Sequence, residues 1–169
     1  MRRISEVKIL LLYFIVMGCL ALALNNLPYI GSDLIDLKKN YSLKEVLDLF
    51  NKFGLEGRRI YIASSSILDT LFPIAYASFF SCIIFMLVKD ISILKYLILV
   101  PPMTALVDLM ENFQIINLLI QYPDFSSLEV VFASLTTRIK HFFVIIQYTS
   151  FMFSILVRIY LYFYQLNKI

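Results

Sequence analysis

The sequence predicts an all-α fold, a polytopic membrane four-helix bundle with a short amphipathic helix in the loop between helices 1 and 2. Two observations predict it. The 169 residues are 60% hydrophobic and only 16% charged, whereas soluble domains are about 45–50% apolar and about 25% charged. Four apolar stretches are each long enough to supply the roughly 20 residues that cross a bilayer. We therefore expect residues 1–169 to form a single transmembrane domain.

The first apolar stretch covers residues 7–27 and follows a basic start that contains Arg2, Arg3 and Lys8. A basic start before an apolar run is similar to a secretory signal peptide. However, the residues after Cys19 are as apolar as those before it. We interpret the stretch as an uncleaved first helix.

The loop after the first stretch contains the predicted short amphipathic helix, from about residue 42 to 53. Ser42 and Glu45 fit the S-x-x-E capping box, and Gly54 is the expected stop. Apolar residues fall at helical spacing on one face; they are Leu43, Val46, Leu47, Phe50 and Phe53. We expect this face to lie on the membrane surface or to cap the bundle. A helix that binds a partner protein is the alternative.

Three further stretches, residues 60–88, 91–121 and about 127–164, predict the other membrane helices. Each is longer than one crossing needs, so these helices must tilt or project beyond the hydrocarbon. Pro73 lies in the second stretch, and the pair at 101–102 lies in the third. Since proline removes a backbone hydrogen bond inside a helix, we expect kinks at these positions.

Four crossings place both termini on one side of the membrane. Basic residues are balanced between the two sides, so their number does not decide the orientation. A first helix with a basic start usually dominates. We therefore predict a protein of the bacterial cytoplasmic membrane with both termini in the cytoplasm.

Polar residues inside the last three stretches predict a buried site. Counted from the loop side, they lie at similar depths of roughly 13–21 Å. The sequence DLMEN at 108–112 places three polar residues at i, i+3 and i+4, on one helix face. On the last helix, residues 137 and 138 lie four and three positions before residue 141, so these three are expected to share a face, while Lys140 is expected to point elsewhere. The candidates for ligand binding or proton handling are Asp69, Asp108, Glu111, Asn112, Thr137, Arg138 and His141.

These charged residues are expected to face one another. A lone charge at the bilayer centre costs at least about 2.5–3.5 kcal/mol. We therefore predict that Arg138 lies within salt-bridge distance of Asp69, Asp108 or Glu111. The site would then form between helices 2, 3 and 4.

Such a site favours binding of a small amphipathic or lipid-like ligand, or conduction of protons. One alternative is a membrane-embedded enzyme of the isomerase or lipid-modifying type, in which Glu111 acts as general acid/base and Arg138 holds an anionic head group. Another is a structural or assembly subunit without chemistry, in which the charges only fix helix register. The sequence names no catalytic residue.

Other classes of site find no support in the sequence. Cys19, Cys82 and His141 are too few for a structural zinc site, and we expect no metal and no cofactor. The net charge is only +3, and the basic residues are scattered, so we expect no nucleic-acid partner. Membrane lipid is the expected partner, and an oligomer stays open because lipid-facing contacts are invisible in sequence.

Four segments carry a resemblance to known proteins: GLEGRRIY at 54–61, LDTLFP at 68–73, DLMEN at 108–112 and TRIK at 137–140. In these segments the chain resembles an uncharacterised family of small four-helix bacterial membrane proteins, with the patterns GxEGRRxY, DxxxP and DxxEN. The resemblance implies that these residues act together. It does not imply any activity. In architecture alone, the chain is also similar to the sterol isomerase-like four-helix membrane fold.

Overall fold

A computed structural model describes residues 2–28, 30 and 33–166, and the side chains of this part except those of residues 2–6 and 166. Four long α-helices dominate it: α1 (Arg2–Asn25), α2 (Leu43–Val88), α3 (Val100–Gln121) and α4 (Ser127–Leu166). Two 3₁₀ helices, η1 (Ile35–Leu37) and η2 (Ser92–Leu99), lie before α2 and α3. The prediction of an all-helical fold with four helices long and apolar enough to cross a membrane is confirmed.

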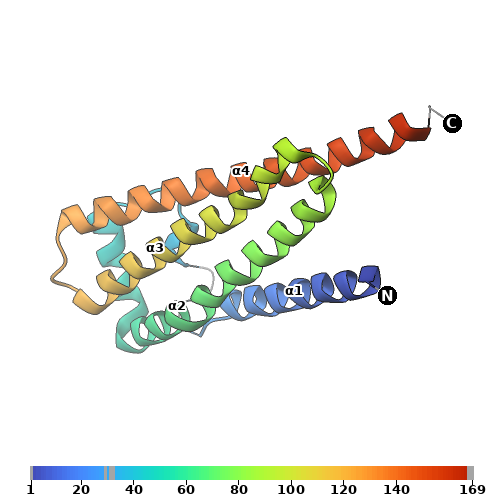
Figure 1. The fold of residues 1–169 in the computed structure, drawn as a ribbon. Coiled ribbons are helices and arrows are strands. Elements are labelled where there is room, and N and C mark those ends of the chain that lie inside the picture. The colour runs from blue at the N-terminus through green and yellow to red at the C-terminus, as the bar shows by residue number, and fades with distance from the viewer. Residues whose placement is uncertain (1, 29, 31–32, 167–169) are drawn as a thin grey trace.

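The four helices form a bundle in which α3 packs against both α2 and α4, and α1 packs mainly against α2 (Figure 1). The N-terminal and C-terminal ends of the described chain lie at the same end of the bundle. The side chains of Arg2 and Arg3, on which the predicted orientation depends, lie outside the described residues. Large apolar side chains point outward along all four helices, among them Leu22, Phe113 and Ile145. This outward apolar surface is the kind that lipid covers.

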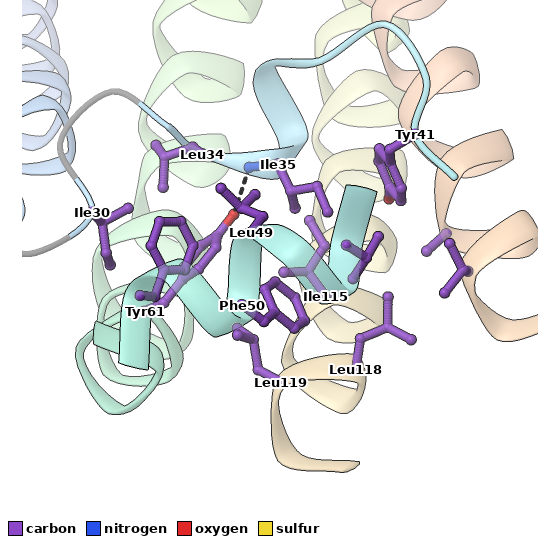
Figure 2. Packing of buried hydrophobic residues seen from close by; sticks show 14 of the residues in the cluster. Ile30, Leu34, Ile35, Tyr41, Leu49, Phe50, Tyr61, Ile115, Leu118 and Leu119 are labelled. Atoms are coloured by element: carbon purple, nitrogen blue, oxygen red, sulfur yellow. Dashed lines mark hydrogen bonds between the residues drawn. The ribbon is translucent and has the colours of Figure 1, made fainter. Parts of the chain in front are cut away.

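The largest buried apolar cluster lies at the opposite end of the bundle, where the α1–α2 connection and the start of α2 cover the helix ends. Figure 2 shows Phe50 of α2 beside Ile115, Leu118 and Leu119 of α3. The Phe50 ring also contacts the Tyr122 ring, at a centroid distance of 6.2 Å. The connection is therefore folded onto the bundle as a packed cap, which we call the apolar cap.

The start of α2 agrees with the capping box, but a separate short amphipathic helix in the loop is not shown. The Ser42 N–H donates to Glu45 Oε2 (2.7 Å), and the Glu45 N–H donates to Ser42 Oγ (3.4 Å). The helical segment then continues through Gly54 to Val88. Gly54 is the one residue of α2 with non-helical angles, φ 64° and ψ −172°. Glycine absorbs the change of direction in one residue, so the helix kinks there and resumes at once.

The prolines do not kink the helices as the sequence suggested. Pro101 and Pro102 lie at the first positions of α3, where a missing N–H leaves no intrahelical bond unmade. The predicted kink at this pair is wrong, because the preceding segment is η2 and the α-helix begins only at Val100. Pro73 does lie inside α2, and the residues around it keep helical angles.

Substitution of Gly54 by alanine is expected to lower the free energy of unfolding by about 1–3 kcal/mol. At φ 64° and ψ −172°, an alanine would occupy a backbone region that is essentially restricted to glycine. Space is not the obstacle, because an added Cβ meets no atom within 4 Å. Thermal unfolding in detergent measures the effect.

Gly18→Ala is the matched control. Gly18 lies inside α1, and an added Cβ there also meets no atom within 4 Å. Since alanine favours a helix over glycine by roughly 1 kcal/mol, Gly18→Ala should leave stability unchanged or slightly raised. Equal losses in both variants would show that Gly54 carries no special backbone requirement.

Candidate functional site

A buried lysine lies at the centre of the polar residues between the helices. Lys140 of α4 is 7% exposed. Its Nζ lies 3.5 Å from Asp36 Oδ2 and 3.4 Å from Asp108 Oδ1, and it pairs most closely with Glu111 Oε2. Because η1 supplies Asp36 and α3 supplies Asp108 and Glu111, one ammonium group joins three segments. We call these four residues the carboxylate–lysine cluster.

Two tyrosine hydroxyl groups of α2 hydrogen-bond to carboxylates of the cluster. The Tyr76 hydroxyl donates to Asp108 Oδ2 (3.0 Å), and the Tyr61 hydroxyl donates to Asp36 Oδ1 (3.3 Å). Tyr61 also accepts a hydrogen bond from the Ile35 N–H (3.1 Å), as drawn in Figure 2. Tyr61 of α2 is thus hydrogen-bonded to two residues of η1, Ile35 and Asp36. The α1–α2 connection is therefore held against α2 by polar as well as apolar contacts.

Glu111 is held from the α4 side through a chain of hydroxyl groups. Glu111 is 0% exposed, and its Oε1 accepts a hydrogen bond from the Thr137 hydroxyl. The Tyr41 hydroxyl lies 3.1 Å from Thr137 Oγ1. Burial raises the pKa of the Tyr41 phenol to about 12, so Tyr41 keeps its proton at neutral pH. Because a hydroxyl has one proton, Tyr41 donates to Thr137 when Thr137 donates to Glu111.

Asn112 and Asp69 link α3 to α2 on the same face. The Asn112 Nδ2 donates to the backbone carbonyl of Asp69 (2.7 Å), which leaves the Asp69 side chain free to point into a cavity. Among the described residues, the Asp69 carboxylate forms no hydrogen bond or ion pair.

The cavity has a volume of about 330 Å³ and lies between α1, η1, α2 and α4, with Asp108 reaching it from α3. Its polar lining consists of Asn25, Asp36, Asp69, Asp108, Lys140, His141 and Gln147. Its apolar lining includes Met17, Ala21, Leu24, Leu34, Phe80 and Val144. The lining therefore combines charged side chains with aliphatic and aromatic ones, the latter mainly from α1 and α2.

The predicted ion pair of Arg138 with the buried acids is wrong, because Lys140 forms these ion pairs instead. Arg138 is exposed and forms no ion pair with any described residue. It borders a surface hollow beside Ser42 and Glu45 instead. Thr137 and Lys140, three residues apart, share the inward face of α4, whereas Arg138 is turned by about 100° from Thr137. The sequence pattern grouped Thr137 with Arg138, whereas the structure groups it with Lys140.

The other predicted residues fall into two groups. Asp108, Glu111 and Thr137 meet directly around Lys140. Asn112 and Asp69 lie at the edge of this group, joined by the amide–carbonyl bond, and His141 lines the cavity. The structure therefore brings together every predicted residue except Arg138.

Sequence reasoning missed Asp36, Gln147 and the tyrosines of the site. A signal for two of them was present, because Tyr61, Asp69 and Tyr76 are separated by eight and seven residues and so share a face of α2. Asp36 gave no such signal, since it lies in a connection without helical periodicity. Gln147 follows Lys140 by seven residues, on the same face of α4.

Within the part of the chain that the structure describes, no group of three or more His, Cys, Asp or Glu side chains is arranged to hold a metal ion. No family model, no curated protein and no solved structure matches this chain. The resemblance to small bacterial membrane proteins therefore stays a prediction, and the candidate function rests on the site itself.

Proposed function

We propose that this is an integral membrane protein that binds a small amphipathic or lipid-like molecule in the cavity beside the carboxylate–lysine cluster. The polar end of the ligand would lie at Asp69 and the cluster, and its apolar part along Met17, Leu24 and Phe80. The observation that carries the proposal is that one cavity combines charged side chains with an extensive apolar lining. Ligand pockets of proteins typically have volumes of about 300–1,000 Å³, and a volume of about 330 Å³ falls in this range.

Unsatisfied polar groups favour a binding site over a purely structural network. A network that only fixes helix register is expected to satisfy each of its buried members. Here the buried Gln147 Oε1 has no hydrogen-bond partner among the described residues, the half-buried Asp69 carboxylate forms no hydrogen bond or ion pair with them, and both side chains line the cavity. A ligand group would satisfy them.

Two other functions receive less support from the same residues. A proton path would have to continue from the cluster to both membrane surfaces, yet the apolar cap lies on its loop side, with Ile35 and Tyr61 almost fully buried. An acid/base enzyme would need its catalytic carboxyl beside the substrate. Glu111, the predicted general acid/base, has no exposed surface and does not line the cavity.

The proposed location is the bacterial cytoplasmic membrane, with both termini in the cytoplasm. Four helices long and apolar enough to cross a membrane support the membrane location. In this orientation the apolar cap and the loop residues would lie on the outer side.

Fluorescence quenching tests the proposal, because the chain contains no tryptophan and one introduced indole reports its own surroundings. Tyr148→Trp places the reporter at the cavity. With the protein in nanodiscs, a dodecanol probe that carries a nitroxide at its chain end should quench this indole in a saturable manner. Phe113→Trp, on the outward surface of α3, should show only quenching proportional to the probe fraction in the bilayer.

A second substitution then blocks the cavity. Ala21→Phe adds a ring to its α1 wall and should abolish the saturable quenching of Tyr148→Trp. Leu22→Phe, one residue away on the outward surface, is the matched control and should leave it intact. Saturable quenching that survives Ala21→Phe would show that the probe binds elsewhere, and the proposed site would then be wrong.

A further inference from the structure

The Lys140 ammonium group is already paired with the carboxylates of the cluster. A lysine ammonium group has three N–H donors and no acceptor. Lys140 faces three carboxylates, one each from Asp36, Asp108 and Glu111. The ammonium group is therefore already paired with three carboxylates, and the lysine offers little to an anionic head group.

Two acceptors without a partner among the described residues belong to side chains that line the cavity. Asp69 presents a carboxylate with no partner among the described residues. Gln147 is 2% exposed, lines the cavity, and its Oε1 has no hydrogen-bond partner in the described part of the chain. A buried acceptor without a partner destabilises a folded protein, so a donor or a positive charge at this place would stabilise the site.

The balance of acidic and basic side chains around the cavity also favours a cationic ligand. Four carboxyl groups lie at the cluster and the cavity, those of Asp36, Asp69, Asp108 and Glu111. Lys140 is the one lysine or arginine among the residues that line the cavity. His141 is the other basic side chain there. The carboxyl groups thus outnumber the ammonium group, and an added positive charge would reduce their repulsion.

Aromatic rings border the same space. Phe72, Tyr76, Phe80 and Tyr148 all line the cavity. They form two contacting pairs, with centroid distances of 5.5 Å between Phe72 and Tyr76 and 5.5 Å between Phe80 and Tyr148. Aromatic faces attract cations, and aromatic surroundings combined with a carboxylate are a common way to recognise ammonium groups.

We propose that the ligand is a cationic amphiphile, whose ammonium head group lies among Asp69, Gln147 and the aromatic rings and whose hydrocarbon chain follows the apolar wall. This inference rests on the proposed function and names the class of its ligand. An inorganic cation fits less well, because its ligands would be oxygen atoms, whereas much of the lining is aromatic or aliphatic.

Displacement of the nitroxide-tailed dodecanol probe from Tyr148→Trp nanodiscs tests the head group. The competitors are dodecyltrimethylammonium, dodecanol and laurate, which share a twelve-carbon chain and differ in charge. We expect dodecyltrimethylammonium to displace the probe at an at least about tenfold lower mole fraction than dodecanol, which corresponds to a free-energy difference within the range of buried cation–π and charge contacts. Laurate should be the weakest competitor.

Asp69→Asn tests whether the preference for the cationic competitor comes from the Asp69 carboxylate. It should bring dodecyltrimethylammonium and dodecanol close to equal strength, while dodecanol still displaces the probe and so shows that the cavity is intact. Asp124→Asn removes the same charge from an exposed turn and should leave the preference unchanged. This control separates recognition at the cavity from a general attraction between the protein and cations.

The possible failures are distinct. If the three competitors displace the probe equally, or if Asp69→Asn keeps the preference, the cationic head group is overturned while ligand binding stands. If neither the dodecanol probe nor a nitroxide-tailed trimethylammonium probe quenches the indole in a saturable manner, both the inference and the proposed function are wrong.

Discussion

Lys140→Met should lower the free energy of unfolding by about 3–5 kcal/mol, because it leaves buried carboxylates without their common counter-charge. The ammonium group contacts three acids from two segments, and its side chain is 7% exposed. Methionine has a similar length and no charge, so the loss reports the ion pairs more than the packing. Thermal or chemical unfolding of the detergent-solubilised protein measures it.

Arg138→Met is the matched control on the same helix. Arg138 is exposed and forms no ion pair with any described residue, so its replacement should change the midpoint of unfolding little. From the sequence alone, Arg138 was the residue predicted to pair with the acids. A large loss in Arg138→Met and a small one in Lys140→Met would restore that prediction and contradict the structure.

A double variant separates electrostatics from shape. Glu111 is the closest partner of Lys140 and is fully buried. Glu111→Gln added to Lys140→Met removes one orphaned charge and should recover part of the stability. Losses that simply add would show that the two side chains act independently. A preserved dodecanol site in the double variant would show that the cluster supports the fold rather than the ligand.

Phe50→Ala is the second substitution for which we expect a large effect, a loss of about 3–5 kcal/mol in the free energy of unfolding. Phe50 is 0% exposed in the apolar cap. Its ring contacts those of Phe53, Tyr122 and Phe125 at centroid distances of 6.5, 6.2 and 6.1 Å. Removal of the ring leaves a cavity where the start of α2 meets the α3–α4 connection.

Phe113→Ala is its control. Phe113 is 66% exposed on α3, where lipid or detergent replaces the lost contacts. Unfolding in detergent should show a small change for Phe113→Ala and a large one for Phe50→Ala. Similar small changes in both would indicate that the cap is loosely packed, and the cap would then not hold Asp36 in the cluster.

Local patterns in the sequence predict the long helices of this protein and the start of α2. Four apolar stretches fixed the number of long helices, since the length of an apolar run decides whether it can cross a bilayer. Ser42 and Glu45 fixed the start of α2 through a local capping box. The spacing of Asp108, Glu111 and Asn112 correctly placed three polar side chains on one face of α3, where all are buried.

The tertiary structure decided which residues meet. Periodicity states which side chains share a face, but α4 has polar residues on two overlapping faces, and only its packing against α3 turned Lys140 inward and Arg138 outward. Gly54 is a second example. The sequence predicted that a short helix ends there, whereas in the fold α2 kinks at Gly54 and continues. Asp36 has no periodic signal at all. It joins Lys140, more than 100 residues away in the chain, because the apolar cap folds its connection onto the bundle, and contacts between distant segments arise from packing that no local pattern encodes.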